Sequence, residues 1–337
     1  MAKSPKVNIR LQAQHARAVV EAAADAFAPG NPHGVVGAAV GPKRVRGRPT
    51  SELALIVFVP RKVDRPPAPV GPVTFMHRGA RREVMPDVVA TGHRAGSVAR
   101  HQPAFNGLYA GCSIQARSTK VVAGAVACLL GPSSGPTHLL TAGHLFAPGA
   151  TNAKVEAAPG PQEPAVVVGR LVRSLLDDPG AGAPLDAALV ALTPAGRRLA
   201  LAGGKSPRLP RLAPASFDTR HVATAWLRVF LPSTGDYVAR LEGDFRLNFY
   251  HADSPFGGTQ TLHNVIETGF VRNVDGDSGT ILMTDDDGAV SRAVGIVVGH
   301  AGASSLHIPV DVALSQLAPE LGGDLAIWSH GPSETLS

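Results

Sequence analysis

The chain has very little cysteine, few aromatic residues and few charged ones. Its 337 residues include two cysteines, 5 % aromatic residues and 17 % charged residues. A disulfide framework is therefore not expected, and Cys112 and Cys128 both stand in apolar or glycine-rich surroundings typical of buried thiols. No apolar run reaches the ~18 residues of a membrane span, and no signal-peptide pattern opens the chain. We expect a cytoplasmic protein without membrane contact.

The residues that are abundant favour short strands joined by tight turns. There are 37 glycines and 29 prolines, and hydrophobic residues make up 44 % of the chain. This composition is typical of all-β barrels and sandwiches rather than of helical bundles. About ten short β-rich runs follow one another after residue 108, among them 121–130, 137–143, 165–172, 186–192, 222–231, 237–243, 245–250, 262–271, 279–283 and 293–299. They predict two packed antiparallel β-barrels.

Four segments can be separated along the chain. Residues 1–30 contain an amphipathic helical pattern over 8–27, and 31–107 read as a small β module. Residues 108–321 carry the two predicted barrels and end in a helical pattern over 310–321. The remainder, 322–337, is expected to be a loose tail.

Charge is concentrated at one end. Residues 1–110 hold 16 Lys and Arg against 6 Asp and Glu, whereas 111–337 hold 16 against 20. A basic module can attract an acidic regulatory partner or nucleic acid. A solvated basic face is favoured over nucleic-acid binding, because no zinc-finger, helix-turn-helix or aromatic RNA-binding signature accompanies the charge.

Three short motifs carry candidate chemistry. Gly276-Asp277-Ser278-Gly279 places glycines beside a serine, which permits a sharp turn whose backbone amides converge on one point. Thr141-Ala142-Gly143-His144 follows an apolar run, and Asp186 opens the otherwise apolar strand LDAALVAL. Each signal alone also fits a structural role, because a lone histidine at a strand end is more often structural and a lone aspartate there suits a turn.

The order and spacing of the three residues strengthen the case. Nucleophilic catalysis by serine needs a base to take its proton and a carboxylate to orient that base. His144, Asp186 and Ser278 occur in this order with gaps of 42 and 92 residues. This order distinguishes the chymotrypsin arrangement from those of subtilisin and the α/β-hydrolases. Asp177 and Asp178 are less suitable partners because they precede Pro-Gly in a predicted exposed turn.

With these motifs the chain resembles the chymotrypsin- and trypsin-like serine peptidases. The blocks TAGH, DAALVAL and GDSG are similar to the family's three signatures, and AVGIVVG (293–299) resembles the strand that pairs with the substrate backbone. The phrases ELALIVFVPRKV, DVVATG and GLYAGCSI in the N-terminal part resemble the narrow-leaf-type trypsin-like proteins of plants and bacteria.

The resemblance implies a role for each motif residue. His144 would be the general base and acid, Asp186 its orienter and Ser278 the nucleophile, with the backbone N–H groups of Gly276 and Ser278 as the oxyanion hole. The expected activity is that of a serine endopeptidase acting on a protein or peptide, without cofactor or metal. Arg272, Val297 and Gly299 would lie at the substrate pocket, although Arg272 also fits a solvent-facing role.

The chain departs from the family pattern at two positions. Leu145 follows the histidine where secreted members have cysteine, so Cys128 has no expected partner. Thr280 replaces a second glycine after GDSG. No site for proteolytic activation is evident in the sequence. We therefore expect the Asp277 carboxylate to pair with a donor group within the chain rather than with a new N-terminus.

Two other functions remain open from the sequence. The barrels could serve as a catalytically silent scaffold for protein binding, or the basic N-terminal third could bind nucleic acid.

Overall fold

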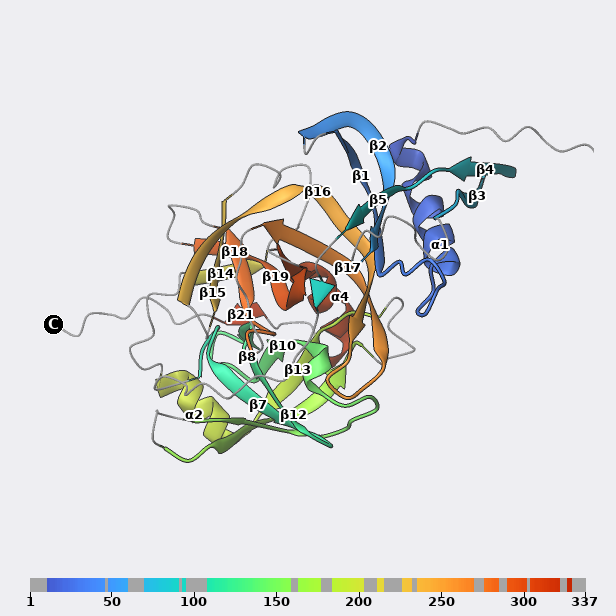
Figure 1. Cartoon of the computed structure of the whole chain (residues 1–337). Helices are drawn as coiled ribbons and strands as arrows, with labels where there is room; N and C mark the ends of the chain where they lie inside the picture. Colours follow the sequence, from blue (N-terminus) through green and yellow to red (C-terminus); the bar gives the residue numbers. More distant parts are fainter. Residues whose placement is uncertain are drawn as a thin grey trace, which may run out of the picture.

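A computed structural model shows a predominantly β chain (Figure 1). It describes residues 11–45, 48–59, 70–90, 93–94, 108–158, 163–176, 184–202, 211–214, 226–231, 235–269, 276–284, 290–301, 304–321 and 326–328. Its strands form one sheet of eight, one of eleven and a separate hairpin. No described helix is long and apolar enough to cross a bilayer.

The eight-stranded sheet curls onto itself. Its order is β21-β9-β10-β13-β12-β11-β7-β8, and every pairing is antiparallel. Only two residues, Val126 and Ala127, separate β8 from β9. One bent segment of chain therefore supplies β9, near one end of the strand order, and β8, at the other end. The strands are β7 (Ser113–Arg117), β8 (Val121–Ala125), β9 (Cys128–Gly131), β10 (His138–Thr141), β11 (Lys154–Ala157), β12 (Val166–Ser174), β13 (Ala188–Leu192) and β21 (Ala326–Trp328).

The eleven-stranded sheet contains a closed ring of six strands. The order β15-β18-β19-β20-β17-β16 closes because β15 also pairs with β16. β1, β2 and β5 continue the order beyond β16, while β6 and β14 pair with β19. The bounds are β1 (Gly37–Val45), β2 (Arg48–Val59), β5 (Asp87–Ala90), β6 (His93–Arg94), β14 (Arg211–Pro214), β15 (Trp226–Leu231), β16 (Gly235–Asp253), β17 (Thr259–Gly269), β18 (Ile281–Thr284), β19 (Val290–Ala301) and β20 (Ser304–Pro309).

The length of β16 joins the N-terminal strands to this ring. With 19 residues, β16 pairs with β15 near its start, through 235–240, and with β1 near its end, through 247–250. Three strands of the predicted module at 31–107, β1, β2 and β5, therefore extend the same sheet as the ring. Ala39, Ile56 and Phe58 from these strands also belong to the main apolar core.

The rest of the N-terminal region builds a smaller core. The 3-10 turn η1 (Ala13–His15) leads into α1 (Ala16–Ala26), which packs beside the hairpin of β3 (Val73–His77) and β4 (Ala80–Val84). Arg78 and Gly79 both have positive φ, as a tight two-residue hairpin turn requires. This smaller core contains Leu11, Val19, Ala23, Phe27, Val35, Ala38, Leu55, Val57, Val59, Val73, Phe75, Val84 and Phe249.

Two further helices and one terminal strand complete the described chain. α4 (Val310–Leu321) occupies the predicted range and buries Val310, Ala313, Leu317 and Leu321 along one face. α2 (Pro194–Ala202) was not predicted; the Thr193 hydroxyl accepts a hydrogen bond from Gly196 N at its start. β21 lies within the predicted tail at 322–337 and pairs with β9, so this part of the tail is ordered by sheet pairing.

Candidate functional site

His144 lies just beyond the end of β10. The chain leaves β10 at Thr141 and forms the short 3-10 turn η2 (Gly143–Leu145), which contains the histidine. A methyl group on Gly143 would come within 3.2 Å of an Asp186 carboxylate oxygen and of the Ala187 backbone oxygen. Glycine therefore lets the histidine turn approach the segment before β13, and His144 is 4 % exposed in this contact.

Asp186 holds His144 through two atoms. Its Oδ2 lies 2.7 Å from His144 Nδ1, and its Oδ1 accepts a hydrogen bond from His144 N at 2.8 Å. Asp186 is fully buried, so both bonds are shielded from water. A carboxylate at Nδ1 favours the tautomer with its proton there, which leaves Nε2 as an acceptor.

Ser278 stands in a tight turn from Asp277 to Thr280. Both the backbone N–H and the hydroxyl of Thr280 donate to the Asp277 carbonyl, at 3.0 and 2.7 Å. Gly279 has a φ of +98°, and a methyl group there would clash with the Ala125 carbonyl. Only glycine suits this position, because other residues rarely adopt such a φ and the backbone contact leaves no space.

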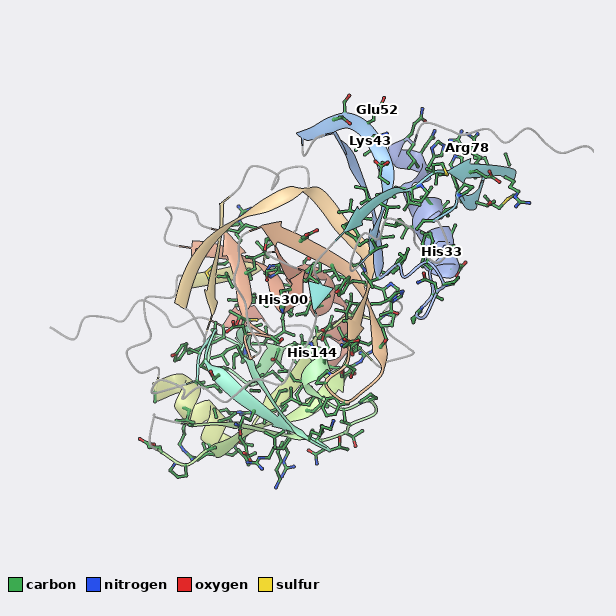
Figure 2. All side chains as sticks on the ribbon, viewed as in Figure 1. His33, Lys43, Glu52, Arg78, His144 and His300 are labelled. Carbon is green, nitrogen blue, oxygen red and sulfur yellow. The ribbon has the colours of Figure 1, made fainter. Side chains whose placement is uncertain are left out.

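Ala125 connects this turn to the histidine segment. Its N–H donates to the Ser278 carbonyl at 2.7 Å, and its own carbonyl accepts the Thr141 hydroxyl at 2.7 Å. A methyl group on Gly124 would lie 2.8 Å from Leu145 Cδ2 and 2.9 Å from the Ser278 carbonyl oxygen. The two motifs therefore meet across β8, where the two sheets adjoin; Figure 2 labels His144 in this region.

The arrangement brings a serine turn and an oriented imidazole to adjoining segments, the two groups that nucleophilic catalysis by serine requires. Ser278 is partly exposed, whereas Asp277 and Thr280 are fully buried. Among the described residues no hydrogen bond joins the Ser278 hydroxyl to the His144 ring. Such bonds are often long without substrate and shorten in the substrate complex.

The other predicted site residues have different positions. Gly276 is half-buried with a φ of +98°. Val297 supports the turn from β19, because its carbonyl accepts from Gly279 N at 2.7 Å and its N–H donates to the Thr280 carbonyl at 2.8 Å. Its backbone groups are thus already used. Gly299 lies farther along β19 opposite Leu306 on β20, and Arg272 lies outside the described residues.

Sequence reasoning missed the role of Thr141. The sequence places Thr141 in the motif before His144 without a role of its own, whereas its fully buried hydroxyl fixes the Ala125 peptide that holds Ser278. The partner lies 16 residues earlier in the chain. A threonine rather than a valine at the end of an apolar strand was the available signal.

The two cysteines are unsuited to nucleophilic chemistry. Burial raises the pKa of Cys112 and of Cys128 to about 12, so neither forms the reactive thiolate near neutral pH. Both thiols are free and buried.

A second buried histidine lies behind the site on β20. His307 pairs across the sheet with Val297, and its Nε2 is 2.9 Å from the Thr268 hydroxyl. Burial lowers the pKa of His307 to about 3, so the ring is neutral at physiological pH.

Comparisons with known proteins find similarity only among solved structures. No family model matches, and no curated protein matches. A glutamic-acid-specific serine protease, described as using a histidine triad in substrate binding, is 19 % identical with a TM-score of 0.42; the alignment covers 66 % of this chain and 100 % of that one. Nocardiopsis protease is 18 % identical with a TM-score of 0.42, and the alignment covers 66 % of this chain and 99 % of that one. Protease A of Thermobifida fusca is 16 % identical with a TM-score of 0.43, and the alignment again covers 66 % of this chain and 99 % of that one.

Proposed function

We propose that the chain is a serine endopeptidase of the double-barrel, trypsin-like type. The observation that carries the proposal is the buried His144–Asp186 pair, 2.7 Å between Nδ1 and Oδ2, with the Ser278 turn held next to the same segment through Ala125. The assignment rests on these residues of the chain itself. A closer relation to the narrow-leaf-type group and a cytoplasmic location remain predictions from the sequence.

The proposed reaction proceeds through an acyl-enzyme. Ser278 Oγ attacks the scissile carbonyl while its proton passes to His144 Nε2, and the new oxyanion accepts hydrogen bonds from the N–H groups of Gly276 and Ser278. Asp186 keeps the ring oriented and stabilises the imidazolium. His144 then gives the proton to the leaving amine, and the C–N bond breaks.

Hydrolysis of the acyl group restores the free serine. A water molecule donates a proton to His144 Nε2 as it attacks the ester carbonyl, and the imidazolium returns this proton to Ser278 Oγ as the acid departs. The proton of Ser278 therefore leaves with the amine, a proton from water replaces it, and His144 Nε2 carries each of them in turn. The step requires no cofactor.

A fluorophosphonate probe tests this assignment. We expect covalent labelling of the wild type at Ser278, and loss of both labelling and casein cleavage in Ser278→Ala. Ser51→Ala is a matched control, because Ser51 is exposed on β2. Labelling located on another serine by peptide mapping would refute the proposal.

A catalytically silent scaffold is the second candidate. The observation in its favour is that no hydrogen bond joins Ser278 to His144 among the described residues. The same probe separates the two candidates. A folded, unlabelled protein that still binds casein would favour the scaffold.

The N-terminal region is proposed to recruit an acidic regulatory partner. Arg78 and Arg81 are exposed on the β3–β4 hairpin. The pKa of the adjacent His15 is lowered first by burial and then by the electrostatic effects of its neighbours, including Arg82 and Arg78. Binding of polyglutamate that weakens with salt, and is lost in Arg78→Ala with Arg81→Ala, would support this role. Preferential binding of RNA would favour the nucleic-acid alternative.

A further inference from the structure

The strand that holds the nucleophile turn has one edge occupied by a distant part of the chain. β19 binds the turn through Val297, as described above. β6 (His93–Arg94), which precedes the eight-stranded sheet in sequence, pairs antiparallel with the end of the same strand. In Figure 1, β6 is the short teal strand near β19.

The pairing partners show which edge of β19 is used by β6. β20 pairs with β19 as far as His300 and Ala301. β6 pairs with these same two residues, so it must lie on the opposite edge. That opposite edge is the one on which β18 pairs with β19, through Ile281 and Ile296.

The Ser278 turn and β6 therefore lie in a row on one edge of β19. The turn leads directly into β18 and bonds to Val297, whereas Arg94, the last residue of β6, lies opposite His300. Val298 and Gly299 separate the two positions. At about 3.4 Å per residue, the distance from Val297 to His300 along the strand is about 10 Å.

An extended peptide cleaved at Ser278 needs this same edge. Extended peptides commonly bind by adding a strand to a sheet edge, since the main chain then supplies hydrogen bonds whatever the sequence. A peptide with several residues on one side of its scissile bond extends over about 10 Å, which reaches the position of β6. The peptide and β6 cannot pair with His300 and Ala301 at the same time.

We propose that β6 is an internal competitor for the peptide-binding edge of β19. The proposal rests on the proposed peptidase function of Ser278. The partner of this edge is an unfolded or extended polypeptide, which binds by backbone pairing after β6 leaves. β6 contributes only two residue pairs, so its displacement is easy for a longer peptide, whereas its attachment to the chain gives it a high effective concentration.

Replacing Arg94 by proline and, separately, by alanine distinguishes the effect of backbone pairing from that of the side chain. Arg94→Pro removes the N–H group while keeping an extended conformation, and Arg94→Ala keeps the N–H group. We expect kcat/KM for fluorescein-labelled casein to rise about tenfold in Arg94→Pro, mainly through a lower KM, and to stay unchanged in Arg94→Ala. Fluorophosphonate labelling is expected to be equal in all three proteins, because this small probe does not need the edge.

A binding assay tests the same edge without catalysis. In the Ser278→Ala background, a fluorescein-labelled peptide TGHRAGSV, corresponding to residues 91–98, is titrated by fluorescence anisotropy. We expect about tenfold tighter binding to the protein that also carries Arg94→Pro than to the one carrying Arg94→Ala.

The outcomes distinguish the two proposals. Equal casein kinetics and equal peptide affinity in the Pro and Ala variants would overturn the role of β6 while leaving the peptidase assignment intact. Tighter peptide binding in the Pro variant, together with no labelling or cleavage in any protein, would overturn the peptidase assignment and keep β6 as the competitor of a peptide-binding edge.

Discussion

Replacing Asp186 by asparagine tests the site most directly. Both carboxylate oxygens accept hydrogen bonds from His144, one from the ring and one from the backbone N–H. Asparagine has one acceptor oxygen and one donor NH₂ group in nearly the same shape. One of the two bonds must therefore be lost, although the side chain still fits its buried position.

Either orientation of the asparagine damages the site. If its NH₂ group faces His144 Nδ1, the ring must carry its proton on Nε2 and cannot accept the proton of Ser278. If the NH₂ group instead faces the backbone N–H, two donors oppose each other in a buried position, which costs about 1–3 kcal/mol. In both cases the imidazolium formed during acyl transfer loses its neighbouring negative charge.

We expect kcat to fall by about four orders of magnitude, by analogy with the same replacement in the serine-protease template. A fall of this size corresponds to about 5 kcal/mol of transition-state stabilisation. The assay is the rate of casein cleavage at saturating substrate, with thermal unfolding to show that the fold persists. Asp253→Asn serves as control because Asp253 is exposed.

The same change at Asp177 or Asp178, which lie outside the described residues, is expected to cost little. Near-normal turnover in Asp186→Asn, together with severe loss in either of these variants, would refute the assignment of the acid.

Three further predictions follow from the packing. Thr141→Val should lower the fluorophosphonate labelling rate at least tenfold by leaving the Ala125 carbonyl without its donor, and Thr141→Ser should restore it; equal rates would remove Thr141 from the site. The free energy of unfolding should fall as the pH drops from 6.5 toward 3. In this range the His307 ring takes up a proton in the unfolded chain, whereas the buried ring in the folded chain stays neutral. Measured by urea unfolding, the loss of stability between pH 7 and pH 4.5 should be smaller for His307→Gln than for the wild type. A fragment starting at Gly107 should keep the His144–Asp186 pair and fluorophosphonate labelling. It should unfold at a lower urea concentration than the full chain, because the edge of β16 that pairs with β1 is uncovered. If labelling returned only when the missing segment was added in trans, that segment would complete the site.

The sequence was most informative where chemistry and local pattern coincide. An aspartate that opens an apolar strand was expected to be buried, and Asp186 is buried against His144, with Oδ2 2.7 Å from Nδ1. The predicted helix at 310–321 was confirmed because its apolar residues repeat at helical spacing.

Features that depend on distant contacts could not be predicted. The apolar run 121–130 gave no sign of the bend at Val126–Ala127, because the bend follows from closure of the sheet. α2 contains a proline and a glycine in a short run, which resembles a turn until Gly196 packs against Val168. The long β16 was predicted as two runs because pairing with both β15 and β1 makes it continuous.

The distribution of the site over two sheets also affects biosynthesis. His144 follows β10 and Asp186 precedes β13 of the eight-stranded sheet, whereas Ser278 is positioned by β19 of the other sheet. During translation, a ribosome-bound chain that has emerged only to about residue 200 contains His144 and Asp186 but not Ser278. β19 is synthesised after Ser278, so the turn gains its support only when residues up to about 300 are available. Under the proposed peptidase function, an unfinished chain would have no cleavage activity until both halves have folded together.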